Sequence, residues 1–287
     1  MQLKDLSEEQ TFMQILQTIA TAYQEISVMK MREARGYIDH ARLFVNMLKD
    51  VFESLRYSQK VLHNLEGNFE GKKPLAKILI TANTKFHGDI LHKIIDSFMK
   101  EQDDKGDTFL IGRIGRELLN EYQQTKNIKL YNIPDVNIKM SVLQPLIKEL
   151  LGYRRIIVYY AKFKSIIEQD PVVTEISNIN KLLDEEPQAE KELREKKTVP
   201  IYMFEPSGEV IASFLNDNVV ISLVRQSILE TQLARYASRI KAMNSLLAKV
   251  DDNLDKLKKI ERKLKRFQSD KKQTERISAM LYINQSA

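Results

Sequence analysis

The stretch VVISLVRQSILETQLARYASRIKAMNSLLAKVDDNLDKLKKIERKLKRFQSDKKQTERISAML, residues 219–281, contains neither glycine nor proline and repeats apolar residues at helical spacing. A second stretch, from Thr11 to about Leu62, has the same periodicity, no proline, and one glycine, Gly36. As helices, the two stretches would each extend roughly 75–95 Å, more than a small domain could cover. We therefore expect the two helices to bury each other as an antiparallel coiled coil.

The region between the two stretches alternates short apolar runs with amphipathic segments. Runs that predict strands lie at 77–82, 108–111, 128–130 and 155–160, and helical patterns at 90–98, 118–122 and 143–150. This alternation predicts an α/β fold: a small, mostly parallel, Rossmann-like domain inserted between the helices. We expect a coil helix over 1–70, the α/β domain over 71–211 with an exposed, charged linker near 184–199, and the second coil helix over 212–287.

Composition excludes several classes of protein. Among 287 residues there is no cysteine, which removes disulfides, thiolate metal sites and cysteine nucleophiles. No apolar run reaches the ~20 residues that span a bilayer, and the N-terminus lacks the features of a signal peptide. We expect a cytoplasmic protein without direct membrane insertion.

Positive charge is concentrated in one part of the chain. The net charge is +6, and nine lysines and arginines lie between Lys256 and Lys272. An apolar repeat continues through the same stretch, so these side chains form either a solvated coil face or a surface for an acidic protein partner. Nucleic acid is disfavoured, because a groove for it needs interleaved aromatic residues and Phe267 stands almost alone.

The motifs of catalytic and cofactor sites are missing. Gly112 and Gly115 follow a predicted strand but lack the three-glycine spacing of a dinucleotide loop, so they indicate a tight turn. The segment 67–72 is too short for a phosphate loop. His87 and His92 are five residues apart, off a common helix face, and we expect both to be exposed rather than metal ligands. No nucleophile has an activating context, so we expect no catalytic residue, no cofactor and no metal.

Five segments, in order along nearly the whole chain, resemble the gamma subunit of F-type ATP synthases, the central rotor shaft. They are TIATAYQEISVMKMREAR (18–35), TFLIGRIGRELL (108–119), YYAKFKSIIEQDPVV (159–173), PIYMFEPSGEVI (200–211) and ETQLARYASRIKAMNS (230–245). Two departures stand out. The glycine-rich loop after the family's first strand is here ANTKFHGD (82–89). About four extra residues lie between Met243 and TERI (274–277), which resembles the family's C-terminal ending.

The resemblance implies a non-catalytic shaft inside a ring of catalytic and non-catalytic nucleotide-binding subunits. It also implies a foot domain that meets an epsilon-type subunit and a membrane rotor ring, at the inner face of the cell membrane. Lys30, Arg32 and Arg239 are then candidates for contacts with acidic loops of the ring, and Met243 and Thr274 are further candidate contacts. For each, the alternative is an ordinary coil side chain.

Other functions stay open at this point. A specialised motor derived from ATP synthase could hydrolyse ATP to drive another process, such as surface motility; the altered loop at 82–89 and the remodelled coil favour it. A non-rotary coiled-coil scaffold with an α/β head is a second alternative. A small-molecule enzyme in the sheet domain is disfavoured, because the sequence contains no recognisable catalytic or cofactor motif.

Overall fold

The computed structural model describes residues 3–58, 73–100, 106–122, 128–136, 138–176, 205 and 207–285. The predicted charged linker near 184–199 and the segment 67–72 lie outside these residues. The chain forms two compact units: Met1–Ile26 with Ile240–Ala287, and Ser27–Arg239.

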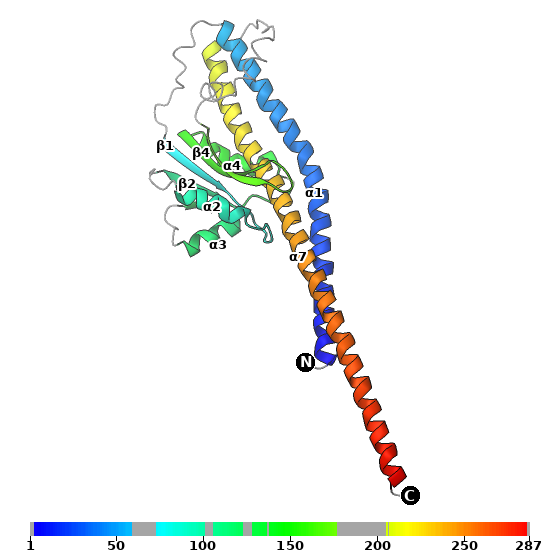
Figure 1. Ribbon diagram of the computed structural model, residues 1–287. Helices are drawn as coiled ribbons and strands as arrows, with labels where there is room; N and C mark the ends of the chain where they lie inside the picture. Colours follow the sequence, from blue (N-terminus) through cyan, green and yellow to red (C-terminus); the bar gives the residue numbers. More distant parts are fainter. Residues whose placement is uncertain are drawn as a thin grey trace. The chain divides into compact units, whose positions relative to one another are not determined.

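Two helices dominate the fold, as the apolar periodicity predicts. Helix α1 runs over Leu3–Ser58 and helix α7 over Gly208–Gln285 (Figure 1). They begin eight and eleven residues before the strongly periodic stretches that start at 11 and 219, because a helix extends beyond its most periodic part. Gly36 lies inside α1 with open space beside it, and the helix continues through it.

In the first unit, α1 and α7 pair antiparallel. The amide of Gln10 donates to Glu261, that of Gln17 to Asp251 and that of Gln24 to Asn244, at 2.8–2.9 Å, so positions rise along α1 as they fall along α7. Buried apolar side chains in this unit are Leu6, Ala20, Ile240, Met243, Val250, Leu254 and Leu257. The paired seam is apolar, and the polar contacts lie beside it.

In the second unit the same two helices also pair antiparallel. One cluster joins Ala34 and Ile38 of α1 to Leu229, Leu233 and Tyr236 of α7. Further along, another cluster joins Phe52 and Leu55 to Ala212, Leu215 and Val219. Beside the first cluster, the Arg42 guanidinium lies 3.1 Å from the carboxylate of buried Glu230. The predicted antiparallel coiled coil is confirmed.

The second unit also contains a five-stranded sheet. Its strands are β1 (Lys73–Ile80), β2 (Asp107–Ile111), β3 (Ile128–Tyr131), β4 (Tyr153–Phe163) and β5 (Gln169–Ile176), in the order β3-β2-β1-β4-β5. The first four are parallel, as predicted, and β5 pairs antiparallel with β4. Strand β5 was not predicted; it is an edge strand that contains Pro171, a residue that sheets accept at an edge.

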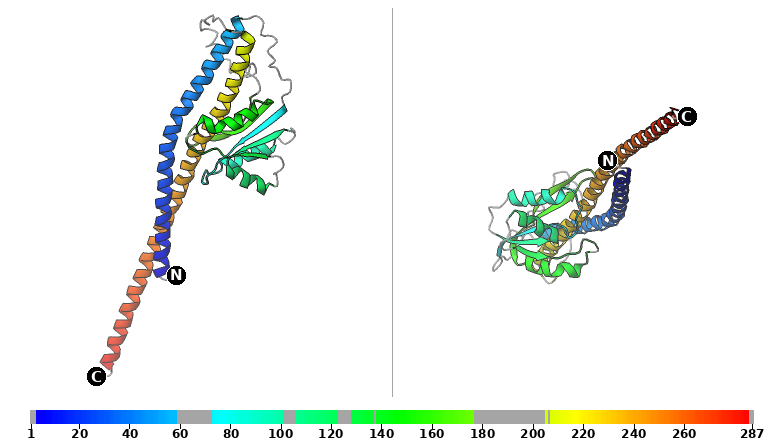
Figure 2. Two further views of the ribbon diagram at one scale, coloured as in Figure 1. Left: turned by 180° about the vertical axis from the view of Figure 1, so that it is seen from behind. Right: turned by 90° about the horizontal axis from the view of Figure 1, so that it is seen from below.

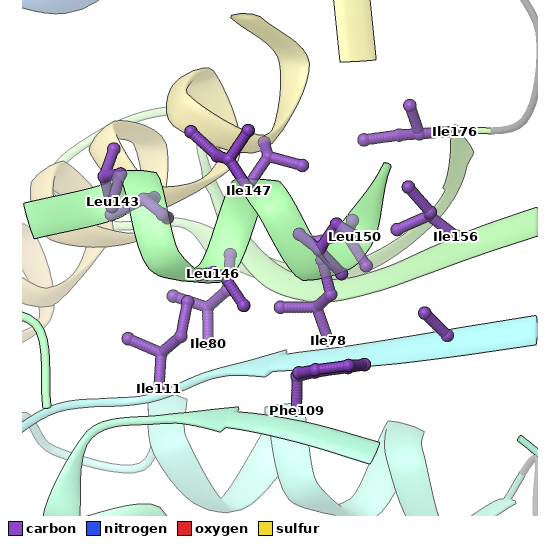
Figure 3. Close-up of a cluster of buried hydrophobic side chains, with 14 of the residues drawn as sticks. Ile78, Ile80, Phe109, Ile111, Leu143, Leu146, Ile147, Leu150, Ile156 and Ile176 are labelled. Atoms are coloured by element: carbon purple, nitrogen blue, oxygen red, sulfur yellow. The ribbon is translucent and has the colours of Figure 1, made fainter. Parts of the chain in front are cut away.

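Helices cover both faces of the sheet. Helices α2 (Ile90–Lys100) and α3 (Arg113–Glu121) lie on one side, and α4 (Met140–Leu150) with α7 lies on the other (Figure 2). On the α4 side, Leu146 and Leu150 point at side chains of β1 and β2 (Figure 3), and Leu143 belongs to the same core. Val220, Val224 and Ile228 of α7 belong to the same core. A coil helix is therefore also a core element of the α/β domain.

Among the described residues, no helix combines the length and the apolar character needed to cross a membrane.

Candidate partner-binding surfaces

Helix α7 buries polar residues where it passes the sheet. Between positions 227 and 239 the buried polar side chains are Ser227, Glu230, Thr231, Gln232, Arg235, Ser238 and Arg239. Burying so many polar groups is unfavourable unless each is hydrogen-bonded. Most of their partners lie in the loops that follow β1 and β3, so this part of α7 sets the shape of those loops.

Asp135, in the loop after β3, is the centre of one network. Its carboxylate accepts hydrogen bonds from the backbone amides of Asn83 and Thr84 and lies 2.9 Å from Nη1 of Arg235. Arg235 also donates to the carbonyl of Thr81. Both charged side chains are largely buried: Arg235 is 5% exposed and Asp135 is 16% exposed. A buried ion pair that is also hydrogen-bonded to the backbone fixes the geometry of both loops.

Arg239 holds the loop 82–89 from the next turn of α7. Its guanidinium donates to the carbonyls of Lys85 (3.1 Å) and Phe86 (3.3 Å) and to the Thr84 hydroxyl (3.2 Å). The side chain is only 8% exposed. Arg239 was predicted to meet a partner; the structure places it inside the chain, where it positions the segment 84–87.

The prediction that His87 is exposed is wrong. The side chain is 4% exposed and lies beneath α7, where the Ser238 hydroxyl donates to the His87 carbonyl and the Arg239 guanidinium lies against the ring. Burial, followed by the positive charges of Arg235 and Arg239, lowers the pKa of His87 to about 2. The loop turns inward here to reach α7, so the imidazole is neutral. His92, on α2, is exposed as predicted.

The same loop presents Lys85 and Phe86 outward. Phe86 has φ 69°, in the left-handed region that a bulky residue rarely adopts, and its side chain is 59% exposed. Such a backbone persists only where its surroundings impose it, and here Arg239 binds the carbonyls of both residues. The segment 82–89 is therefore a turn that Arg239 holds in place and that exposes the ring of Phe86.

The turn at Gly112 is tight, and the amides that follow it are hydrogen-bonded within the chain. Gly112 has φ 100°, and a Cβ there would lie 2.7 Å from Ala82 backbone atoms. The first amides of α3 already have partners: Arg113 donates to Asn83 Oδ1, Ile114 to the Ala82 carbonyl and Gly115 to the Thr81 hydroxyl. A phosphate at the start of α3 would have to be bound by these same amides. They are instead hydrogen-bonded to residues 81–83, in and after the end of β1.

Lys30 lies at a groove between α1, α7 and the loop that precedes α4. The groove has a volume of about 410 Å³, and its apolar lining includes Ala34, Val136, Ile138 and Leu229. Lys30, Lys139 and Arg225 supply three positive charges at its edge and Glu33 one negative charge. Nζ of Lys30 lies 2.8 Å from Glu33, whose hydrogen bond raises the pKa of Lys30. The surplus of positive charge suits an acidic ligand.

The other predicted contact residues are spread over the chain and form no single site. Arg32 is exposed on α1, while Met243 is buried within the first unit. Thr274 is exposed near the end of α7, where its hydroxyl donates to the Asp270 carbonyl at 2.9 Å. Asp135 and Arg235 were not predicted to be functional residues. A usable signal was Arg235 itself, a charge within the apolar run of α7 beside Ala234.

Across the part of the chain that the structure describes, no group of three or more histidine, aspartate or glutamate side chains is placed to hold a metal ion.

Comparisons with known proteins agree on one family. A family model described as ATP synthase matches residues 2–268. The ATP synthase gamma chain of Halothermothrix orenii is 23% identical over 269 residues, covering 89% of this chain and 90% of the relative. That of Pelotomaculum thermopropionicum is 25% identical over 268 residues, covering 89% of each.

Solved structures show the same fold. A chain in the rotor of Euglena gracilis mitochondrial ATP synthase superposes with a TM-score of 0.62 at 13% identity, covering 92% of this chain and 97% of that one. A chain in the central stalk and c-ring of the Tetrahymena thermophila mitochondrial enzyme gives 0.56 at 18% identity, covering 79% and 98%. Paired long helices, an inserted parallel sheet and a match along almost the whole length together mean that the chain belongs to the ATP synthase gamma-chain family.

Proposed function

We propose that this gamma-type chain is the central shaft of an F-type rotary ATPase and couples rotation to nucleotide turnover in a surrounding ring of catalytic and non-catalytic subunits. The observation that carries the proposal is that α1 and α7 pair antiparallel in both units while α7 is also part of the sheet core. The chain itself is non-catalytic. At its foot it meets an epsilon-type subunit and a membrane rotor ring, peripheral to the inner face of the cell membrane.

The coupling follows from asymmetry. One rod inside a ring of repeated subunits makes different contacts with each of them, and only such differential contacts can bias their conformations. Turning the rod exchanges the contacts and therefore the conformations. Within the second unit, Val220, Val224 and Ile228 pack into the sheet core, so the α/β domain and this part of α7 turn together.

Two surfaces are proposed as points of contact. The groove beside Lys30 offers positive charge to an acidic loop of a ring subunit, with Arg32 nearby in sequence. Arg239 acts through the loop 82–89, by holding Lys85 and Phe86 outward. Met243, in the segment 230–245, and Thr274, near the end of α7, remain proposed contacts. The division at 1–70, 71–211 and 212–287 remains the proposed division into coil helix, foot domain and coil helix.

A specialised motor is the second candidate. Phe86 at positive φ, in the place of the family's glycine-rich loop, gives the foot domain an aromatic surface. Such a surface would suit a partner other than the usual foot subunits, in a machine that hydrolyses ATP to drive another process such as surface motility. Identifying the companion that binds the foot domain separates this motor from a synthase.

Purification of the native complex tests the proposal. The full chain, isolated from its own cells under mild conditions, should bring along two kinds of nucleotide-binding subunit in excess over itself. An epsilon-type subunit and a membrane ring in the same preparation would favour the synthase, and other companions the specialised motor. A chain that purifies alone would instead be a coiled-coil scaffold, and the shaft proposal would be wrong.

A further inference from the structure

The groove beside Lys30 is built by three segments of the second unit. Helix α1 contributes Lys30, Ala34 and Tyr37, helix α7 contributes Arg225, Leu229 and Gln232, and residues 136, 138 and 139, which precede α4, supply the third side. On each helix these positions are three or four residues apart, so each set lies on one helix face. The groove is therefore a depression bounded by three separate segments of the fold.

The buried part of the lining, which we call the floor, is mainly apolar and is fixed by the core. Ala34 and Leu229 are 4% and 5% exposed and belong to the same core cluster as Tyr236. Gln232 is also buried, and its side-chain nitrogen donates to the Asp135 carbonyl and to the Tyr236 hydroxyl. A ligand would therefore meet a preformed, mostly apolar surface, as small organic molecules do in most binding sites.

The exposed part of the lining, which we call the rim, carries uncompensated positive charge. Lys30 lies 2.8 Å from Glu33, so these two charges cancel. Arg225 and Lys139 are exposed and come from different segments, and neither lies within 4 Å of a carboxylate in the part of the chain that the structure describes. The ring of Tyr37, 53% exposed, adds an aromatic side. The rim thus offers two unpaired cations and an aromatic ring beside an apolar floor.

These features together select one class of ligand. An inorganic anion would leave the apolar floor in water, and a neutral apolar molecule would gain nothing from the two cations. A peptide loop on the floor would bury polar backbone groups where Gln232 has already used its donor, which is unfavourable. The volume of about 410 Å³ lies near the lower end of the roughly 300–1,000 Å³ of small-molecule sites.

We propose that this groove binds a small amphipathic anion: an aromatic body of about two or three rings that carries one carboxylate, sulfonate or phosphate. The body lies on Ala34 and Leu229 beside Tyr37, and the anionic group lies near Arg225 and Lys139. Binding is a property of this chain and does not depend on the ring of the proposed function. If the rim also meets an acidic loop of that ring, the bound anion competes with the loop.

The experiment uses two matched fluorescent probes: 8-anilinonaphthalene-1-sulfonate, and N-phenyl-1-naphthylamine, which has the same rings without the sulfonate. The full chain contains no tryptophan, so Tyr37→Trp introduces a single indole at the groove, and energy transfer from it to the probe reports binding there. Tyr122→Trp, exposed at the end of α3 on the other side of the sheet, is the reference for binding elsewhere. Circular dichroism checks that every variant keeps the wild-type helix content.

We expect the sulfonate probe to bind Tyr37→Trp at least about fivefold more tightly than the neutral probe, with much weaker transfer from Tyr122→Trp. Arg225→Gln, made in the Tyr37→Trp chain, should weaken binding of the sulfonate probe about three- to tenfold and leave the neutral probe within about twofold. Arg262→Gln, at an exposed site further along α7, should change neither. The preference for the sulfonate should shrink at about 0.5 M NaCl, because salt screens exposed charges.

Equal affinity for the two probes, equal effects of Arg225→Gln and Arg262→Gln, or no transfer from Tyr37→Trp would overturn the inference. Competition separates the classes of ligand: 2-naphthoate, an aromatic carboxylate, should displace the sulfonate probe, and hexaglutamate should not. Displacement by hexaglutamate alone would assign the groove to an acidic peptide and would also overturn the inference. The shaft proposal is tested separately, by purification of the native complex, and stands or falls independently of these results.

Discussion

The Arg239 guanidinium lies against the His87 imidazole, with Nη2 3.2 Å from Nε2 and 3.3 Å from Nδ1. Both side chains are buried. A protonated ring here would place a second cation beside Arg239 and near Arg235, away from water. His87 is therefore a neutral spacer between the loop 82–89 and α7, and its neutrality makes the fold sensitive to acid.

Acid should destabilise the folded chain at pH values well above those at which carboxylates titrate. In the unfolded chain His87 takes up a proton near pH 6.5, whereas in the folded chain its pKa is about 2. Between these values the unfolded state binds more protons, so stability rises with pH and falls as pH falls below 6.5. We expect the free energy of unfolding to drop by about 1 kcal/mol from His87 between pH 7 and 5.5. Urea denaturation at the two pH values measures it.

A matched pair of variants isolates this effect. His87→Gln should remove this part of the pH dependence, while His92→Gln, on the exposed side of α2, should preserve it. If His87→Gln and wild type lose the same stability on acidification, the buried histidine is not the cause.

Removing Arg239 should loosen the loop 82–89. Arg239→Met leaves the carbonyls of Lys85 and Phe86 without their donor and releases the strained Phe86 backbone. We expect a loss of about 2–4 kcal/mol of stability and faster hydrogen exchange at the amides of residues 84–88. Arg116→Met, at an exposed site on α3, is the control and should change neither. Unchanged exchange in Arg239→Met would mean that the loop keeps its shape unaided.

Changing the charge at the Lys30 groove should alter the coupled turnover of the assembled complex and leave its assembly intact. An exposed ion pair is worth only ~0–1 kcal/mol, but a pair dehydrated at an interface couples more strongly. We expect Lys30→Ala to lower coupled turnover roughly two- to tenfold and Lys30→Glu to lower it further, since the latter adds repulsion. ATPase rate and single-molecule rotation measure this.

Two controls accompany the Lys30 variants. Lys249→Glu changes an exposed charge elsewhere on α7 and should be silent. Lys30→Ala combined with Glu33→Gln tests whether the carboxylate freed from its 2.8 Å partner causes the defect. Wild-type turnover and torque in Lys30→Glu would remove Lys30 from the mechanism and leave the shaft assignment intact.

The isolated chain should neither bind nor hydrolyse ATP. The amides of Arg113, Ile114 and Gly115, which open α3 after β2, already donate to residues 81–83. A phosphate would have to break these bonds. Calorimetry with MgATP should give no heat of binding at micromolar to millimolar nucleotide, and micromolar affinity would point to an enzyme in the sheet domain.

Local sequence patterns predict the helices and strands. The features that were not predicted depend on contacts between residues far apart in the sequence. The paired helices and the parallel strands β1, β2 and β4 follow from periodicities visible within a few turns or residues of chain. The burial of His87 does not, because it depends on Ser238 and Arg239, some 150 residues later. The pairing of Asp135 with Arg235 likewise joins positions 100 residues apart. Arg235 lies in the segment 230–245, but nothing in that segment indicates Asp135 as its partner, so their pairing becomes visible only in the folded chain.

The placement of Val220, Val224 and Ile228 in the sheet core has a consequence for synthesis on the ribosome. Strand β4 ends at Phe163, so at ordinary translation rates on the order of 3–12 s pass before Val224 emerges. Throughout that interval the sheet lacks one of its covering helices, and α1 lacks its partner along its whole length. A nascent chain halted before position 220 would thus expose both an apolar sheet face and an unpaired helix to chaperones. The first three quarters of the chain therefore need the last quarter in order to complete their fold.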